Sequence, residues 1–242
     1  YLWREKLRKF KVFIMLIFLG MNIFAVNNIN EEQLQNKQFY LNKKIDFSLV
    51  QGKERKKVFI QTLVPIIEKV EDEIKGEKDF IKKILDRGTI TLEEKKVAEE
   101  LFVKYKVKSK DYNELLNKMV VPPVSLVIAQ ASLESGWGTS SVAKKGNNLF
   151  GMKSFSKDPK NSVKVGKKTY YKKYETIDDS VKDYILTLAR HGAYKQLRTA
   201  IVNGDNSLKL VQHLNSYSEI KEEYGRKLAT IIRVNNLLDH DA

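Results

Sequence analysis

The sequence predicts a mainly α-helical protein with one small β-hairpin. Apolar residues recur at helical spacing through most of residues 53–238, and residues that commonly start helices precede several of these stretches. Residues 162–174 break from this spacing, because two short runs rich in Val, Thr and Tyr flank Gly166, which is typical of a hairpin. A chain of 242 residues, 42% of them hydrophobic, is long enough for one packed domain with an accessory region.

The first 26 residues are typical of a signal peptide or a membrane anchor. A basic start precedes an apolar stretch over residues 12–26, which is short for a membrane span and long enough for a signal-peptide core. Ala25 is a candidate last residue before cleavage. Ile23 fits a small-residue cleavage site poorly, so an uncleaved anchor stays open. The polar residues 27–52 have no clear period and are predicted to be a linker.

Residues 53–120 are predicted to form a helical accessory region. A long helix, or two, is expected over residues 53–86, with Pro65 kinking or breaking it. A capping box that begins at Thr91 predicts a second helix, and Asp111 predicts the start of a third. The charged residues here are typical of solvated helix faces, and no catalytic pattern accompanies them.

Residues 121–238 are predicted to form the main domain. Its first helix should begin after Pro123 and end before Gly136, following the preference for proline at helix starts and glycine at helix ends. After the hairpin, a capping motif at Thr176 predicts the next helix. Short helices are expected over residues 195–202, 207–214 and 221–238.

Glu134 is the candidate catalytic residue. The helix over residues 124–135 is apolar or small on nearly all sides, which predicts burial, yet Glu134 stands in its last turn. Removal from water and the negative end of the helix dipole both disfavour the ionised carboxylate. A carboxylic acid that stays protonated near neutral pH can act as a general acid. The alternative is a structural ion pair of Glu134 with Lys or Arg.

The composition excludes several other chemistries. There are no cysteines, and His191, His213 and His240 share no metal-ligand spacing, so we predict no metal site and no cofactor. Lys and Arg number 44 against 30 Asp and Glu, which favours polyanionic surroundings. No nucleic-acid-binding motif accompanies this charge, so no nucleic-acid partner is predicted.

Two segments carry a resemblance to a known family. They read AQASLESGWGT at residues 129–139 and GNNLFGM at residues 146–152. This joined motif resembles the glucosaminidase domain of glycoside hydrolase family 73, in particular its Bax-type bacterial members, and the resemblance covers residues 121–238. It implies a lysozyme-like fold with the hairpin beside the active-site groove. It also implies cleavage of the β-1,4 bond after N-acetylglucosamine in bacterial cell-wall peptidoglycan, with Glu134 as the acid.

The same resemblance implies contacts to the sugar. Trp137, whose flat apolar face suits a sugar ring, Asn148, Phe150 and Tyr194 would hold the glycan or shape its groove. For Trp137, Phe150 and Tyr194 a purely structural role stays open. From the sequence, Tyr217 and Tyr224 can face either the groove or the core.

The second carboxylate that most glycosidases use is hard to find. Asp158 is the candidate in the hairpin region, and Glu175 is a weaker one. Asp158 could activate water, the N-acetyl group of the substrate could supply the nucleophile, or another element could bring in a carboxylate. A muramidase, a lytic transglycosylase and a non-catalytic wall-binding protein stay as alternatives.

The expected partner is the peptidoglycan glycan strand. The expected location is the periplasm or cell envelope, with membrane contact only through the N-terminal segment. The sequence does not predict the oligomeric state.

Overall fold

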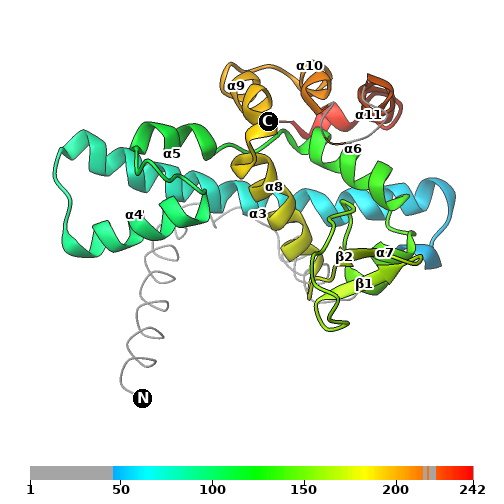
Figure 1. Cartoon of the computed structure of the whole chain (residues 1–242). Coiled ribbons are helices and arrows are strands. Elements are labelled where there is room, and N and C mark those ends of the chain that lie inside the picture. Colours follow the sequence, from blue (N-terminus) through cyan, green and yellow to red (C-terminus); the bar gives the residue numbers. More distant parts are fainter. Residues whose placement is uncertain (1–45, 215–216, 218–221, 242) are drawn as a thin grey trace, which may run out of the picture. The chain divides into compact units, whose positions relative to one another are not determined.

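The computed structural model describes residues 46–214, 217 and 222–241 (Figure 1). The predicted export segment, residues 1–26, and most of the predicted linker, residues 27–52, lie outside this part. Among the described residues, none of the helices combines the length and the apolar character needed to cross a membrane.

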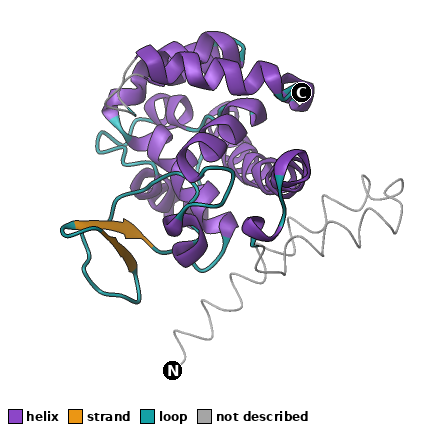
Figure 2. Cartoon of the chain, turned by 90° about the vertical axis from the view of Figure 1, so that its right-hand side faces the viewer, coloured by secondary structure: helices purple, strands orange, loops and turns teal. Residues whose placement is uncertain are grey.

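The described elements are mostly helices with one pair of strands, as predicted (Figure 2). In chain order they are η1 Phe47–Leu49, α3 Gly52–Arg87, α4 Leu92–Lys104, α5 Tyr112–Lys118, α6 Val124–Ser135, α7 Ser141–Gly146, β1 Ser162–Val165, β2 Thr169–Lys172, α8 Ile177–Arg190, η2 Gly192–Tyr194, α9 Lys195–Val202, α10 Ser207–Leu210, η3 Val211–Leu214, α11 Glu222–Val234 and η4 Leu237–His240.

The long helix α3 is the longest described element. Its 36 residues span about 54 Å, and it packs against α6 and α8. The predicted break at Pro65 is wrong, because the helix continues through this residue. Leu63 and Ile66, which flank Pro65, are fully or almost fully buried, so packing holds the helix together across the one hydrogen bond that proline cannot make.

The accessory helices α4 and α5 begin as their capping residues predict. Thr91 and Glu94 form a reciprocal capping box, and Asp111 caps α5. One carboxylate on α3 holds this region in place: Glu77 accepts hydrogen bonds from Lys104 at 2.5 Å and from the hydroxyl of Tyr105 at 2.8 Å.

The short helix α6 lies in the interior, between α3 on one side and α10, α11 and η4 on the other (Figure 1). Its residues from Val124 to Ser132 are all buried. Pro123 stands directly before the first turn of α6, and its side chain accepts no hydrogen bond that could cap the helix. The carboxylate of Asp241 accepts hydrogen bonds from the backbone N–H and the hydroxyl of Ser125 instead, so the side chain of Asp241 caps this helix.

The strands form the predicted hairpin. β1 and β2 pair antiparallel, with Ser162 opposite Lys172 and Val165 opposite Thr169, and the turn contains Gly166 at φ 64°. The hairpin packs on α7, and in Figure 2 it lies at the edge of the helical body.

Candidate active site

Glu134 lies in the last turn of α6, just before Gly136 ends the helix in the left-handed conformation at φ 58°. Its side chain is partly buried. Burial raises the pKa of the Glu134 carboxyl, and a hydrogen bond from Tyr224 opposes this effect without cancelling it. Lys and Arg do not pair with Glu134 in the part of the chain that the structure describes, so the structural ion pair is not what holds it.

A chain of three side chains fixes the orientation of the Glu134 carboxyl. The hydroxyl of Tyr224 donates to Oε1 of Glu134 at 2.8 Å. Nε2 of Gln130 donates to the same hydroxyl at 3.0 Å, and the hydroxyl of Tyr184 donates to Oε1 of Gln130. Since Tyr224 accepts from Gln130, its single proton is free for Glu134.

This arrangement assigns the two oxygens of Glu134 different roles. Oε1 accepts a hydrogen bond from Tyr224, so the acid proton belongs on Oε2. Gly151 faces that second oxygen, because a Cβ added to this glycine would stand 3.4 Å from Oε2. Residue 151 therefore places no side chain against Oε2.

Aromatic rings from distant parts of the chain surround this carboxyl. Tyr217 stacks on Tyr224 with ring centres 5.8 Å apart, and Tyr184 stacks on Phe150 at 4.0 Å. The hydroxyl of Tyr217 donates to the backbone oxygen of Phe150 at 2.8 Å. Phe150 is 1% exposed, so its ring is packed inside the protein against this cluster. A direct contact between its side chain and the sugar stays a prediction.

The structure brings Tyr194 to the same cluster. Its ring lies 6.4 Å from that of Tyr217 and 5.8 Å from that of His191. Burial raises the pKa of the Tyr194 hydroxyl. This hydroxyl makes no hydrogen bond within the described ranges, so it does not cap backbone groups there, and its contact with the sugar stays a prediction.

Trp137 lies in a different environment. Its backbone is in the left-handed region at φ 57°, and its ring packs edge-on against Phe59 of α3, with centres 5.5 Å apart. Nζ of Lys56 lies 5.0 Å from the centre of the Trp137 ring. These contacts place Trp137 beside α3 and outside the tyrosine cluster, so its predicted contact with sugar stays a prediction.

Asn148 holds the backbone around the site. Its buried amide group donates to the backbone oxygens of Met152 and Lys172, both at 2.9 Å, and accepts from the N–H of Met152 at 3.0 Å. These bonds tie the segment that contains Gly151 to strand β2. The geometry favours the groove-shaping role for Asn148 over a direct sugar contact.

Asp158 is exposed, in the loop before β1. Its carboxylate accepts hydrogen bonds from the N–H of Lys160 at 2.9 Å and from the amide of Asn161 at 3.2 Å, which stabilises a local turn. Neither Asp158 nor any other carboxylate of the described residues contributes to the pKa shift of Glu134. Asp158 is thus tied to its own turn, and its role as the carboxylate that activates water stays a prediction.

The sequence contained one usable signal for the partners of Glu134. Gln130 stands four residues before Glu134, so both side chains share one helix face. The position of Tyr224 depends on how α11 packs on α6, and no local pattern encodes this.

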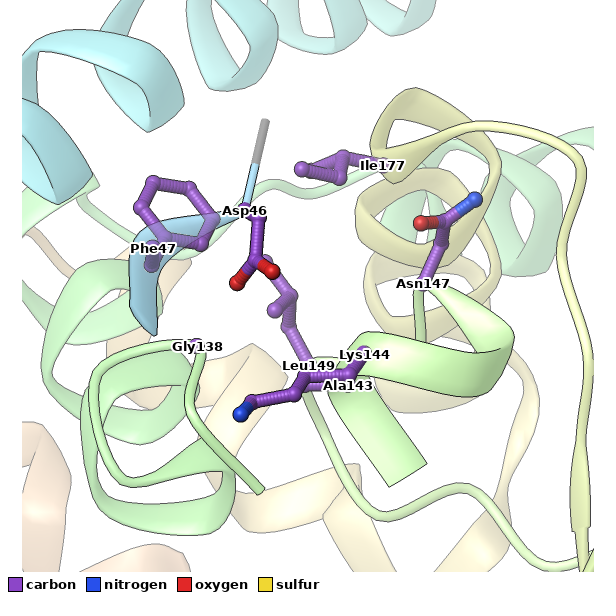
Figure 3. Close-up of a pocket in the computed structure, with 8 residues that line it drawn as sticks. All are labelled: Asp46, Phe47, Gly138, Ala143, Lys144, Asn147, Leu149 and Ile177. Atoms are coloured by element: carbon purple, nitrogen blue, oxygen red, sulfur yellow. The ribbon is translucent and has the colours of Figure 1, made fainter. Parts of the chain in front are cut away.

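A separate cavity of about 250 Å³ is lined in part by Gly138, in the turn that follows α6 (Figure 3). In the figure, Phe47 and Gly138 face Asn147 and Ile177 across it. Its lining residues are Asp46, Phe47, Gly138, Ala143, Lys144, Asn147, Leu149 and Ile177. Glu134 and its tyrosine partners do not line it, so this cavity is distinct from the site around the acid.

Known proteins match both this site and the helices before it. The model of the glucosaminidase family, described as mannosyl-glycoprotein endo-beta-N-acetylglucosaminidase, matches residues 109–237. The Escherichia coli protein Bax is 29% identical over 199 residues, which is 77% of this chain and 72% of Bax. The Vibrio cholerae peptidoglycan hydrolase FlgJ is 31% identical over 45% of this chain and 36% of its own length. The Bacillus subtilis exo-glucosaminidase LytG is 29% identical over 48% of this chain and 45% of its own.

Proposed function

Because the chain belongs to the glucosaminidase family of glycoside hydrolases, we propose that it cleaves the β-1,4 bond after N-acetylglucosamine in peptidoglycan, with Glu134 as the general acid. The peptidoglycan substrate is supported by the similarity to FlgJ, and the glucosaminidase specificity by the similarity to LytG. The chain spans less than half the length of these two relatives.

One observation carries the proposal. The carboxyl of Glu134 is partly buried and has its pKa raised by this burial, it accepts one hydrogen bond through Oε1, and its Oε2 faces a glycine. A protonated Oε2 can donate its proton to the glycosidic oxygen while the bond from that oxygen to C1 of the sugar breaks. Glu134 is then ionised, and the hydrogen bond from Tyr224 stabilises the carboxylate.

For the second half of the reaction we favour the route through the substrate. The N-acetyl oxygen of the sugar attacks C1 and forms a cyclic intermediate. Water then attacks C1 while it transfers a proton to the Glu134 carboxylate, the bond from C1 to the N-acetyl oxygen breaks, and the acid is restored. The position of Asp158 in an exposed loop, with its carboxylate bonded to the local turn, supports this route over water activation by Asp158. The same observation favours one alternative enzyme, a lytic transglycosylase, because that reaction also needs a single acid.

Reducing-end analysis of purified peptidoglycan after digestion by the full chain tests the proposal. We expect new N-acetylglucosamine reducing ends from the wild type. For Glu134→Gln we expect release at least about 100-fold slower, because Gln has no acidic proton. Glu99→Gln, which removes a carboxylate on α4, is the matched control. New N-acetylmuramic acid reducing ends would assign a muramidase, and anhydro ends a lytic transglycosylase.

The same assay separates the two routes for the second step. Asp158→Asn keeps most of the activity if the N-acetyl group is the nucleophile, and loses at least about 100-fold if Asp158 activates water. A chain that sediments with wall sacculi but releases no sugar ends would be a binding protein, and the enzymatic proposal would fail.

We further propose that the protein acts in the cell envelope. Peptidoglycan lies outside the cytoplasmic membrane, and the basic and apolar pattern of residues 1–26 is typical of an export segment. Fractionation of cells that produce the full chain tests this: recovery in the cytoplasm alone would contradict it.

A further inference from the structure

An exposed lysine surface extends from the hairpin beside the site. We define it as the exposed lysines from the segment before β1 to the residue directly after β2 that form no ion pair within the described part of the chain. They are Lys153, Lys157, Lys160, Lys164, Lys167, Lys168 and Lys173. The acidic residue within this stretch is Asp158, and its carboxylate is bonded to the local turn. The surface therefore carries a clear excess of positive charge.

The scarcity of carboxylates sets this surface apart from the helices. Along the helices, lysines are interspersed with acidic residues and some pair with them, for example Lys69 with Asp178 and Lys182 with Glu73. In the hairpin, Lys172 alone has such a partner, Asp183 at 2.6 Å, and it lies at the base of the hairpin where β2 meets the body. Unpaired lysines that are close together repel one another, which a bound anion would relieve.

The lysine surface is connected directly to the segment that borders the acid. The N–H of Lys172 donates to the backbone oxygen of Met152 at 2.8 Å, and the N–H of Ser154 donates to the oxygen of Tyr170 at 2.8 Å. Met152 follows Gly151, the residue that faces Oε2 of Glu134. A polymer that binds over Gly151 would therefore contact the base of the hairpin where it extends beyond the acid.

We propose that the lysine surface binds the free carboxylates of the peptide stems on the strand that is being cleaved. This inference rests on the proposed function. A Lys ammonium is a mobile point charge on a long side chain, so it suits carboxylates spread along a flexible polymer better than one fixed anion. Such a surface concentrates an anionic substrate near the site and speeds its association.

Phe155 adds an apolar contact to the same surface. Its side chain is fully exposed, in the loop between Lys153 and Lys157. A single exposed aromatic ring is common on proteins, so Phe155 alone indicates nothing. Placed among unpaired lysines next to the site, it offers a flat face to a stem or sugar that the lysines hold.

The test compares two forms of one substrate. Intact peptidoglycan carries free stem carboxylates, and carbodiimide coupling with ammonium converts them to neutral amides. The variant replaces three lysines at the turn of the hairpin, Lys164→Gln, Lys167→Gln and Lys168→Gln, in the full chain. The control makes the same change in net charge on the accessory helices: Lys82→Gln, Lys83→Gln and Lys95→Gln. All six side chains are exposed, so both variants should fold like the wild type, which thermal melts check.

The hairpin variant should lose about tenfold in kcat/KM on intact peptidoglycan at low salt, and less than about twofold on the amidated form. Its activity on the intact form should also fall less steeply with added salt than that of the wild type, because fewer charges remain to be screened. The control variant should change by less than about twofold on both substrates. Phe155→Ser should lower kcat/KM on both substrates without changing the salt dependence.

Equal losses of the hairpin variant on both substrates, or an equal loss in the control variant, would overturn the inference and leave the lysines as a solvated edge that resists strand aggregation. Failure of the proposed function looks different, since the wild type would then release no reducing ends from either substrate. Cosedimentation of the same variants with intact and amidated sacculi would still measure the lysine surface in that case.

Discussion

Two opposing influences set the pKa of the Glu134 carboxyl. Burial raises the pKa, and the hydrogen bond from Tyr224 lowers it by a smaller amount. This combination of a raised pKa and one stabilising hydrogen bond suits a general acid before and after it donates its proton. The raised pKa keeps the proton available, and the tyrosine stabilises the carboxylate that remains after donation.

Tyr224→Phe should move this balance in a defined direction. Removal of the hydroxyl eliminates the influence that lowers the pKa of Glu134, so this pKa rises further. A general acid is active below its pKa, so the alkaline limb of the pH profile of kcat/KM should shift to higher pH. The maximal rate should fall by about tenfold to 1,000-fold, because the carboxyl is no longer oriented.

Tyr105→Phe is the matched control for that variant. Its hydroxyl donates to Glu77 at 2.8 Å, so the change removes the same kind of bond far from the acid. An unchanged alkaline limb for Tyr224→Phe, or a shift to lower pH, would mean that Tyr224 does not tune Glu134.

At the scale of elements, the turn after α6 depends on a close contact with η1. A Cβ added to Gly138 would stand 2.2 Å from Cδ2 of Phe47, far inside van der Waals contact, and Phe47 is 2% exposed. Phe47 in turn packs edge-on against Phe59 of α3 at 5.0 Å. The sharp turn that follows the acid is thus held by residues that precede the family match.

Gly138→Ala should therefore be costly. Gly166→Ala is the control: both glycines have positive φ, 78° and 64°, but a Cβ at Gly166 meets nothing within 4 Å. Both variants lose stability through backbone strain, about 1–2 kcal/mol. Gly138→Ala should lose about 1–3 kcal/mol more through overpacking against Phe47. Urea unfolding measures both losses, and equal losses would contradict the contact.

The sequence predicted local features well, because their causes are local. The capping box at Thr91, the Asp111 cap and the turn at Gly166 depend on residues within a few positions of each other. The sequence left open whether residues 53–86 form one helix or two, since the burial of Leu63 and Ile66 that outweighs Pro65 depends on packing against other elements. The tyrosine cluster was equally hidden, because Tyr217 and Tyr224 reach Glu134 only through the packing of distant helices.

At the scale of the whole molecule, helix α3 contacts two separate segments of the part that matches the family. Phe59 contacts the ring of Trp137, and Lys56 donates to the side chain of Asn235 at 3.1 Å, just after α11. We therefore predict that the helical region before the family match folds together with the catalytic part.

Phe59→Ala tests this prediction. Phe59 is fully buried, so the substitution should cost about 3–5 kcal/mol in the free energy of unfolding. Helix content and hydrolytic activity should disappear together in one urea transition. Val103→Ala, on the exposed side of α4, should cost less than about 0.5 kcal/mol. Two separate transitions, with activity surviving the loss of part of the helix content, would contradict a single cooperative unit.

We propose that Glu134 keeps its proton at a pH where an ordinary glutamate has lost it. The carbon-13 resonance of its side-chain carboxyl, assigned by its disappearance in Glu134→Gln, measures this directly in the full chain. We expect the Glu134 carboxyl to titrate with a midpoint clearly above the usual value of about 4.3, and with a still higher midpoint in Tyr224→Phe. A midpoint at or below the usual value in the wild type would contradict it.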